Sequence, residues 1–229
     1  MIIAKFYHFK NKTVNLETLY PGLYLLKFNN HYDMCMTFLR YQEKYESPNI
    51  KFRNKNFTII DFMEWYSKDR NNNLPYFSYT VDWAGFNIPD LIFKDNWFNE
   101  IIDKNKYDIF MLNVISKINK DCKKNNLSKY YLIGSVDNNT VNHEVAHGLY
   151  YLNKDYKNKM NLLTGKLPKS FVKNINFWLK SVGYTKKVFK DEIQAYMSTG
   201  FPDNVKLPKD FKSLCEEYKC IYKNFTNKN

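Results

Sequence analysis

The sequence contains few of the residues that break a chain into separate folding units. Only seven glycines and seven prolines occur among 229 residues, and no internal repeat or Gly/Pro/Ser-rich linker divides them. With 44% hydrophobic residues, the chain is long enough to bury a sizeable core. The sequence therefore predicts one domain over residues 1–229, with an N-terminal α/β part at 1–128 and a helical part at 129–225.

Long apolar runs and paired cysteines are also missing. No stretch of about eighteen apolar residues is present, so no membrane span is expected. The first residues, MIIAKFYHFKNK, lack the layout of a secretory signal. The four cysteines form no C-x-x-C pair, which argues against a cysteine zinc knuckle and favours reduced thiols. These absences predict a cytoplasmic protein.

Arginine is scarce although the chain is basic. The net charge is +12 and the pI is about 9.3, but 32 of the 35 basic residues are lysine. Basic surfaces attract nucleic acids, anionic membranes or acidic proteins. Arginine is preferred for bidentate contacts with phosphates and bases, so its scarcity argues against a nucleic-acid partner. Lysine excess together with frequent asparagine is typical of an AT-rich genome.

Periodicity predicts a mainly helical α+β fold. Short apolar runs at 2–9, 22–28 and 129–136 are typical of strands, and the aromatic segment 75–93 is expected to form strands and turns. Amphipathic patterns predict the following helices: 31–47, 57–70, 106–124, 141–156, 170–183, 188–200 and 210–225.

The segment VNHEVAHGLYYLNKDY, residues 141–156, carries two histidines four positions apart. At 100° per residue, His147 lies only about 40° round the helix from His143, so both imidazoles can reach one metal ion. Glu144 lies about 100° from His143, where it can hold a metal-bound water without ligating the metal. The pattern H-E-x-x-H therefore predicts a metal site, although exposed or core histidines at this spacing are the simpler alternative.

The remaining faces of this helix have distinct characters. Apolar residues gather on the side roughly opposite the histidines, and they are Val141, Val145, Leu149 and Leu152. Tyr150 and Tyr151 flank the histidine face. We therefore expect the apolar side to pack on the core and the histidines to face a cleft.

A third protein ligand is needed for a catalytic zinc ion. The sequence lacks the extended motif that supplies a third histidine, because Tyr150 and Asn153 replace its glycine and histidine. In VFKDEIQAYMSTG, residues 188–200, Glu192 falls on the apolar side of the predicted helix. A buried glutamate needs compensation, which a metal, a tyrosine hydroxyl or a lysine would provide. Asp191 falls on the opposite side, which argues against contact with the site.

Glu216 and Glu217 compete for the role of third ligand. They lie in a polar, lysine-rich helix near the end of the chain, so Glu192 is favoured.

The motif HEVAHG, with DEIQAY following so that Glu192 lies 45 residues after His147, resembles the gluzincin type of zinc metallopeptidase. The strand at 129–136 is similar to the zincin layout, in which an edge strand borders the substrate cleft. The resemblance implies Zn²⁺ held by His143, His147 and Glu192, and Glu144 as general base. It also implies a downstream oxyanion donor, for which Tyr196 and Tyr150 are the candidates.

Two other functions stay open at this point. A non-enzymatic binding or regulatory protein could keep a zincin scaffold, and a basic nucleic-acid-associated protein could carry the histidine pair by chance. Glu144 favours the enzyme, since a structural metal needs no base. The expected partner is therefore a peptide or protein substrate.

Overall fold

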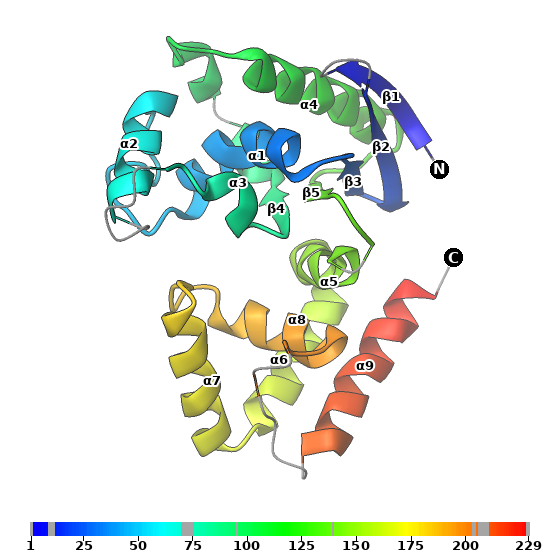
Figure 1. The fold of residues 1–229 in the computed structure, drawn as a ribbon. Helices are drawn as coiled ribbons and strands as arrows, with labels where there is room; N and C mark the ends of the chain where they lie inside the picture. Colours follow the sequence, from blue (N-terminus) through cyan, green and yellow to red (C-terminus); the bar gives the residue numbers. More distant parts are fainter. Residues whose placement is uncertain are drawn as a thin grey trace. The chain divides into compact units, whose positions relative to one another are not determined.

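The computed structural model describes residues 2–8, 12–69, 76–94, 96–138, 140–202, 205 and 211–227 (Figure 1). The ends of some expected elements, at residues 9, 70, 75 and 210, lie outside these described residues. The chain forms two compact units, Met1–Val141 and Asn142–Asn229. The described elements make it an α+β protein that is mostly helical.

The first unit contains a mixed five-stranded sheet in the order β1-β2-β3-β5-β4. The strands are β1 (Ile2–His8), β2 (Lys12–Tyr20), β3 (Leu23–Lys27), β4 (Gly85–Pro89) and β5 (Tyr131–Ser135). β3 and β5 pair in parallel, and the other neighbours pair antiparallel. The strand expected at 129–136 is β5, an inner strand with every residue buried, and not the edge strand of the zincin layout.

The helices of this unit are α1 (His31–Glu46), α2 (Ile59–Asp69), α3 (Tyr79–Asp82) and α4 (Lys106–Lys124), with 3-10 turns η1 (Asp90–Phe93) and η2 (Asn96–Glu100). Asn105 and Asp108 form a capping box at the start of α4. α1 packs closely on the sheet, because a Cβ atom added at Gly134 would lie 2.3 Å from the ring of Phe38. The segment 76–93 therefore contains short helical turns as well as the expected strand.

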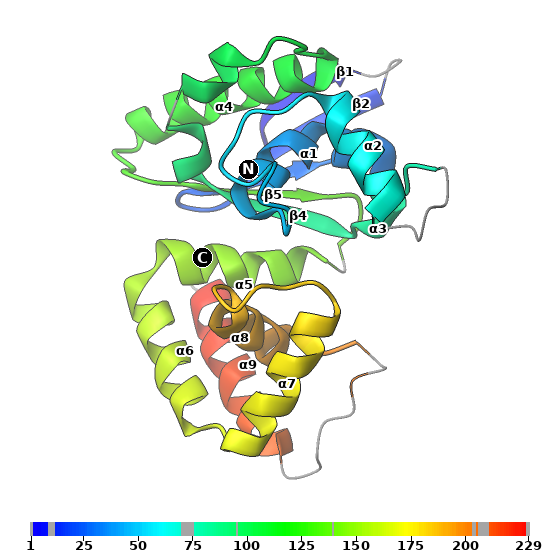
Figure 2. The ribbon, with the colours of Figure 1, turned by 90° about the vertical axis from the view of Figure 1, so that its left-hand side faces the viewer.

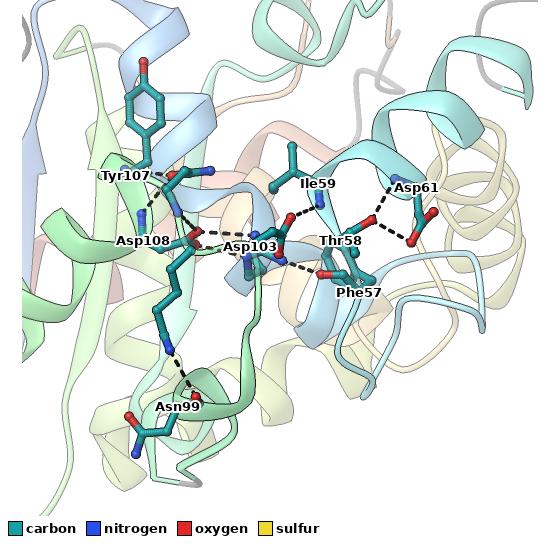
Figure 3. A network of polar contacts seen from close by, with 11 residues as sticks. Phe57, Thr58, Ile59, Asp61, Asn99, Asp103, Tyr107 and Asp108 are labelled. Atoms are coloured by element: carbon teal, nitrogen blue, oxygen red, sulfur yellow. Dashed lines mark hydrogen bonds and ion pairs between the residues drawn. The ribbon is translucent and has the colours of Figure 1, made fainter.

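A buried arginine, Arg40, joins the helices of the first unit through a network in which Figure 3 labels its partners Asp103, Asp108 and Phe57. The Arg40 guanidinium pairs with Asp108 at 3.1 Å and with Asp103 at 3.2 Å, and it also donates to the carbonyl of Phe57. Asp103 accepts the backbone N–H of Ile59 at 2.9 Å. These contacts link α1 to the starts of α2 and α4. The buried Arg40 therefore has a structural role in holding these helices together.

The second unit is a group of helices around a central one (Figure 2). The elements are α5 (Val141–Leu152), α6 (Lys154–Lys166), α7 (Lys169–Ser181), α8 (Phe189–Thr199) and α9 (Lys212–Thr226). α8 packs against α6, α7 and α9, and polar as well as apolar side chains on it are buried. It ends at Gly200, where φ is +112° and a residue without a Cβ is favoured.

The helix expected at 141–156 is in fact two helices. α5 ends at Leu152, and the side chain of Asn153 accepts the backbone N–H of Tyr156 at 3.0 Å, which caps α6. α6 was not anticipated from the sequence. Among the described residues, no helix combines the length and apolar composition of a membrane span.

Candidate metal centre

The two helices that carry the motif residues bring three ligand groups together in the second unit. Nε2 of His143 lies 3.2 Å from Nε2 of His147, both on α5. The carboxylate of Glu192 on α8 lies 3.7 Å from Nε2 of His143 and 3.6 Å from Nε2 of His147. All three ligand atoms lie within 4.8 Å of one another, so this group could hold a metal ion. These are the three ligands expected from the sequence.

The second nitrogen of each imidazole is held by α8. Nδ1 of His147 donates to Oδ1 of Asp191 at 2.9 Å. Nδ1 of His143 lies 3.2 Å from the hydroxyl of Thr199, which donates its own proton to the carbonyl of Ala195 at 2.8 Å. Thr199 therefore accepts from His143. Both Nδ1 atoms carry protons, so the Nε2 atoms, which face Glu192, are the ones left to ligate a metal once any proton on them is displaced.

Asp191 is itself held in place by a buried amide. Nε2 of Gln194 donates to Oδ1 of Asp191 at 2.9 Å and to the carbonyl of Ala146 at 3.3 Å. Oε1 of Gln194 accepts the hydroxyl proton of Tyr156 at 2.9 Å. The network thus connects α5, α6 and α8 behind His147. The expectation that Asp191 faces away from the site is wrong, because helices surround α8 and its polar side is buried too.

The carboxylate of Glu192 is buried and lacks a hydrogen-bond partner for one of its oxygens in the described part of the chain. Its side chain is 8% exposed, and its Oε2 atom has no hydrogen-bond partner in the described part of the chain. Burial raises the pKa of Glu192 to about 7, although the charge of His147 opposes this rise. Leaving a buried charged oxygen without a partner is costly. A metal ion bound by Glu192 and the two Nε2 atoms would remove that cost, so the donor set fits a metal.

The two histidines differ in their affinity for protons. Burial and the neighbouring His147 lower the pKa of His143 to about 4. Burial alone would also lower the pKa of His147, but the carboxylates of Asp191 and Glu192 raise it to about 10. At neutral pH, His147 therefore holds a proton that a metal ion has to displace, whereas His143 is already neutral.

Glu144 is buried on α5 beside the same cluster. Its charge acts to raise the pKa of His143, His147, Tyr184 and Tyr196, so its carboxylate interacts electrostatically with all four. Glu144 is not one of the three grouped ligands. It therefore lies next to the centre without belonging to the ligand set.

An aromatic group borders the site on the side of His143. The centre of the Tyr196 ring lies 4.4 Å from the centre of the His143 imidazole. The ring centres of Trp178 and Phe201 lie 5.1 Å and 5.2 Å from it. The hydroxyl groups of Tyr184 and Tyr196 also interact, which raises the pKa of Tyr184 and lowers that of Tyr196. Burial raises the pKa of Tyr196 to about 12 and raises that of Tyr184 well above its usual range. Both phenols therefore keep their protons at neutral pH.

Tyr150, the other candidate donor, is turned toward α6. Its hydroxyl donates to Oδ1 of Asn161 at 2.7 Å, and the ammonium group of Lys157 lies 4.7 Å from the centre of its ring. The structure therefore brings Tyr196, and not the hydroxyl of Tyr150, to the histidine pair.

Three residues of the site have no signal in the sequence. Tyr184 lies in the connection between α7 and α8, where no periodicity predicts the direction of a side chain. Thr199 and Gln194 lie on faces of α8 that a helical wheel assigns to solvent or to no particular neighbour. The proximity of Thr199 to Gly200, the expected helix end, is the only available hint for one of them.

Comparison of the chain with models of protein families, with curated proteins and with solved structures finds no match. The resemblance to gluzincins therefore rests on the motif residues of the sequence alone.

Proposed function

We propose that this protein is a zinc-dependent peptidase with a zincin-like arrangement in which Glu144 is the general base. The observation that carries the proposal is the convergence of His143, His147 and Glu192, with the carboxylate of Glu144 beside them and outside the ligand set. A purely structural metal site uses four protein ligands and needs no adjacent base. Three ligands and a base are typical of metal-assisted hydrolysis.

The donor atoms favour zinc over other common metals. Two imidazole nitrogens and one carboxylate form a set that zinc accepts readily, whereas calcium and magnesium prefer sites made of oxygen atoms alone. When bound, zinc supplies Lewis-acid activation of water and polarises the carbonyl that is attacked. His143, His147 and Glu192 would hold it, and Asp191 and Thr199 would keep the imidazoles oriented.

Proton transfer is the part of the reaction that falls to Glu144. Its carboxylate would accept a proton from the attacking water and deliver it to the leaving amine. The carboxylate lies near His143, Tyr184 and Tyr196, in a region from which water is largely excluded. This placement supports the role, because proton transfer needs an acid or base within hydrogen-bond reach of the reacting atoms.

Tyr184 and Tyr196 are the candidates for stabilising the oxyanion. Their high pKa values keep both hydroxyl groups protonated. Each hydroxyl group therefore has a proton that it can donate to a developing negative charge. The ring contact with His143 places Tyr196 at the edge of the site.

The four cysteines are free in the structure, which supports a reducing, cytoplasmic location.

The experiment that tests the proposal separates metal binding from turnover. Zinc-loaded wild-type protein is incubated with a mixture of unmodified peptides, and cleavage is followed by mass spectrometry. We expect Glu144→Gln to keep one zinc per chain and to lose turnover by about 100-fold or more, as loss of a general base predicts. Glu216→Gln, an exposed glutamate paired with Lys219, is the matched control and should retain full activity.

The opposite outcomes have distinct meanings. Equal turnover in wild-type protein and Glu144→Gln would remove Glu144 from the reaction. Zinc binding without any cleavage by the wild-type protein would favour the non-enzymatic alternative, a binding protein that keeps the scaffold.

A further inference from the structure

The segment from Tyr156 in α6 to Lys190 in the first turn of α8 is positively charged and contains no acidic residue. Between Tyr156 and Lys190 there are nine lysines and no aspartate or glutamate. All nine are exposed, and they are Lys157, Lys159, Lys166, Lys169, Lys173, Lys180, Lys186, Lys187 and Lys190. We refer to residues 156–190 as the lysine segment. Its charge is not visible from the composition of the whole chain, which contains 23 acidic residues.

Most of these lysines have no role in holding the fold. Lys157 lies over the ring of Tyr150, and Lys159 pairs with Asp155 at 3.0 Å. In the part of the chain that the structure describes, the other seven make no ion pair with a carboxylate. Their positive charge therefore faces solvent without a partner.

Three of the seven lie directly before the metal-site residues. Lys186 and Lys187 occupy the turn between α7 and α8, and Lys190 is in the first turn of α8, next to Asp191 and Glu192. Positive charges are unfavourable at the N-terminus of a helix, because the peptide dipoles already make that end positive. Their presence is therefore not explained by the stability of α8.

The lysines could instead balance the negative charge of the candidate site. That role accounts for only part of their positive charge. Glu144, Asp191 and Glu192 carry three negative charges when ionised, and a divalent cation would cancel two of them. One lysine would balance the remainder. The lysine segment thus leaves a surplus of positive charge in the chain that leads up to Asp191 and Glu192.

We propose that the lysine segment selects acidic polypeptides as substrates, with Lys186, Lys187 and Lys190 binding carboxylates close to the scissile bond. This inference rests on the proposed peptidase function. Exposed charges of one sign attract an oppositely charged partner and raise its association rate by about ten- to a thousandfold at low salt. A polypeptide is favoured over a nucleic acid because Asn142–Asn229 contains no arginine for bidentate phosphate contacts.

Cleavage of matched peptides tests the proposal. The probes are a fluorogenic peptide with several glutamates on both sides of the cleaved bond and a counterpart with glutamine at the same positions. For the zinc-loaded full chain, we expect kcat/KM to be roughly tenfold higher for the glutamate peptide at about 50 mM salt. The difference should disappear at about 500 mM salt, because exposed charges are then screened. Equal rates for the two peptides at low salt would overturn the proposal.

Two triple variants locate the effect. Lys186→Gln/Lys187→Gln/Lys190→Gln should lose most of the preference for the glutamate peptide, because kcat/KM for that peptide falls toward the value for the glutamine peptide. Lys212→Gln/Lys219→Gln/Lys223→Gln removes the same charge from α9 and should keep the preference. Equal losses in the two variants would assign the effect to overall charge and contradict the lysine segment.

Binding measured without turnover separates this inference from the proposed function. Fluorescence anisotropy of the labelled glutamate peptide with Glu144→Gln should show binding that weakens with salt and with loss of the three lysines. Such binding without any cleavage by the wild-type protein would overturn the peptidase and leave the docking of acidic chains intact. Tighter lysine-dependent binding of single-stranded DNA or of phosphatidylserine vesicles than of the peptide would overturn the choice of an acidic polypeptide.

Discussion

Asp191 holds His147 through a hydrogen bond of 2.9 Å between Oδ1 and Nδ1, and it directly precedes Glu192 in the sequence. One turn of α8 therefore supplies both a ligand candidate and the carboxylate that orients a second one. Consecutive residues on a helix diverge by about 100°, so both can reach the site only because His147 lies between them.

Asp191→Asn should weaken zinc binding by about 10- to 100-fold, the usual loss when a carboxylate behind a ligating histidine is removed. Asparagine keeps the shape and can still accept from Nδ1, so the fold should persist. Competition with a chelator of known affinity measures the change. Asp155→Asn removes an exposed carboxylate from the same unit and is the control. An unchanged affinity in Asp191→Asn would show that its charge does not act on His147.

Gln194→Met should lower stability more than it lowers metal affinity. Gln194 is fully buried and forms hydrogen bonds with Asp191, with the carbonyl of Ala146 and with the hydroxyl of Tyr156. Methionine would remove these three hydrogen bonds. We expect the free energy of unfolding to fall by about 1–3 kcal/mol, the range for buried groups that lose a hydrogen bond. Chemical denaturation measures it. No change in stability would mean that the network behind His147 contributes nothing to the fold.

Zinc affinity should rise with pH. His147 has a pKa of about 10 without metal, so zinc displaces one proton from it at neutral pH, and Glu192, with a pKa of about 7, binds a second proton as pH falls further. His143, with a pKa of about 4, remains neutral throughout. Affinity should therefore increase about tenfold per pH unit between 7.5 and 9.5, and more steeply below 7. Calorimetry in buffers of different ionisation enthalpy counts the protons released, and a pH-independent affinity would contradict these protonation states.

Tyr196→Phe should lower kcat by about 100- to 1000-fold with little change in KM or zinc content, as for the loss of one oxyanion donor. The ring contacts with His143, Trp178 and Phe201 would survive in phenylalanine. Tyr184→Phe should have a smaller effect, because Tyr196 is the tyrosine whose ring contacts His143. Tyr150→Phe is the control, since its hydroxyl is bound to Asn161. A larger loss in Tyr150→Phe than in Tyr196→Phe would reverse the assignment.

Arg40→Met should destabilise the first unit by about 3–5 kcal/mol, because it leaves the buried carboxylate of Asp108 without its positive partner. Replacing Asp108 with asparagine in the same chain should recover part of the loss. Thermal unfolding of the metal-free proteins measures both. Equal stability of wild-type protein and Arg40→Met would mean that the ion pair does not support the fold.

The ligand set could be predicted because its two parts depend on local rules. The register of His143 and His147 follows from helical geometry alone. Glu192 could be selected because a glutamate on an apolar helix face needs a partner. The direction of Asp191 could not be predicted, since a helical wheel gives angles within one helix and not which sides its neighbours cover. α8 is enclosed by other helices, so its polar side is also buried.

The ends of the helices and strands could likewise be predicted only where local sequence patterns determine them. The helices at 31–46 and 106–124 were expected within one residue, because apolar residues recur along them at helical spacing. The break at Asn153 was missed, since asparagine is compatible with a helix interior and signals a cap only when its side chain bonds Tyr156. The pairing of β5 with β3 and β4 joins segments far apart in the sequence, which local patterns do not encode.

The position of a bound zinc ion tests the central claim most directly. Crystals of the zinc-loaded protein, measured on both sides of the zinc absorption edge, would give an anomalous difference map. We predict one peak about 2.0–2.2 Å from Nε2 of His143, Nε2 of His147 and the carboxylate of Glu192. A zinc peak bound elsewhere, or none at this group in protein that carries one zinc per chain, would contradict the account.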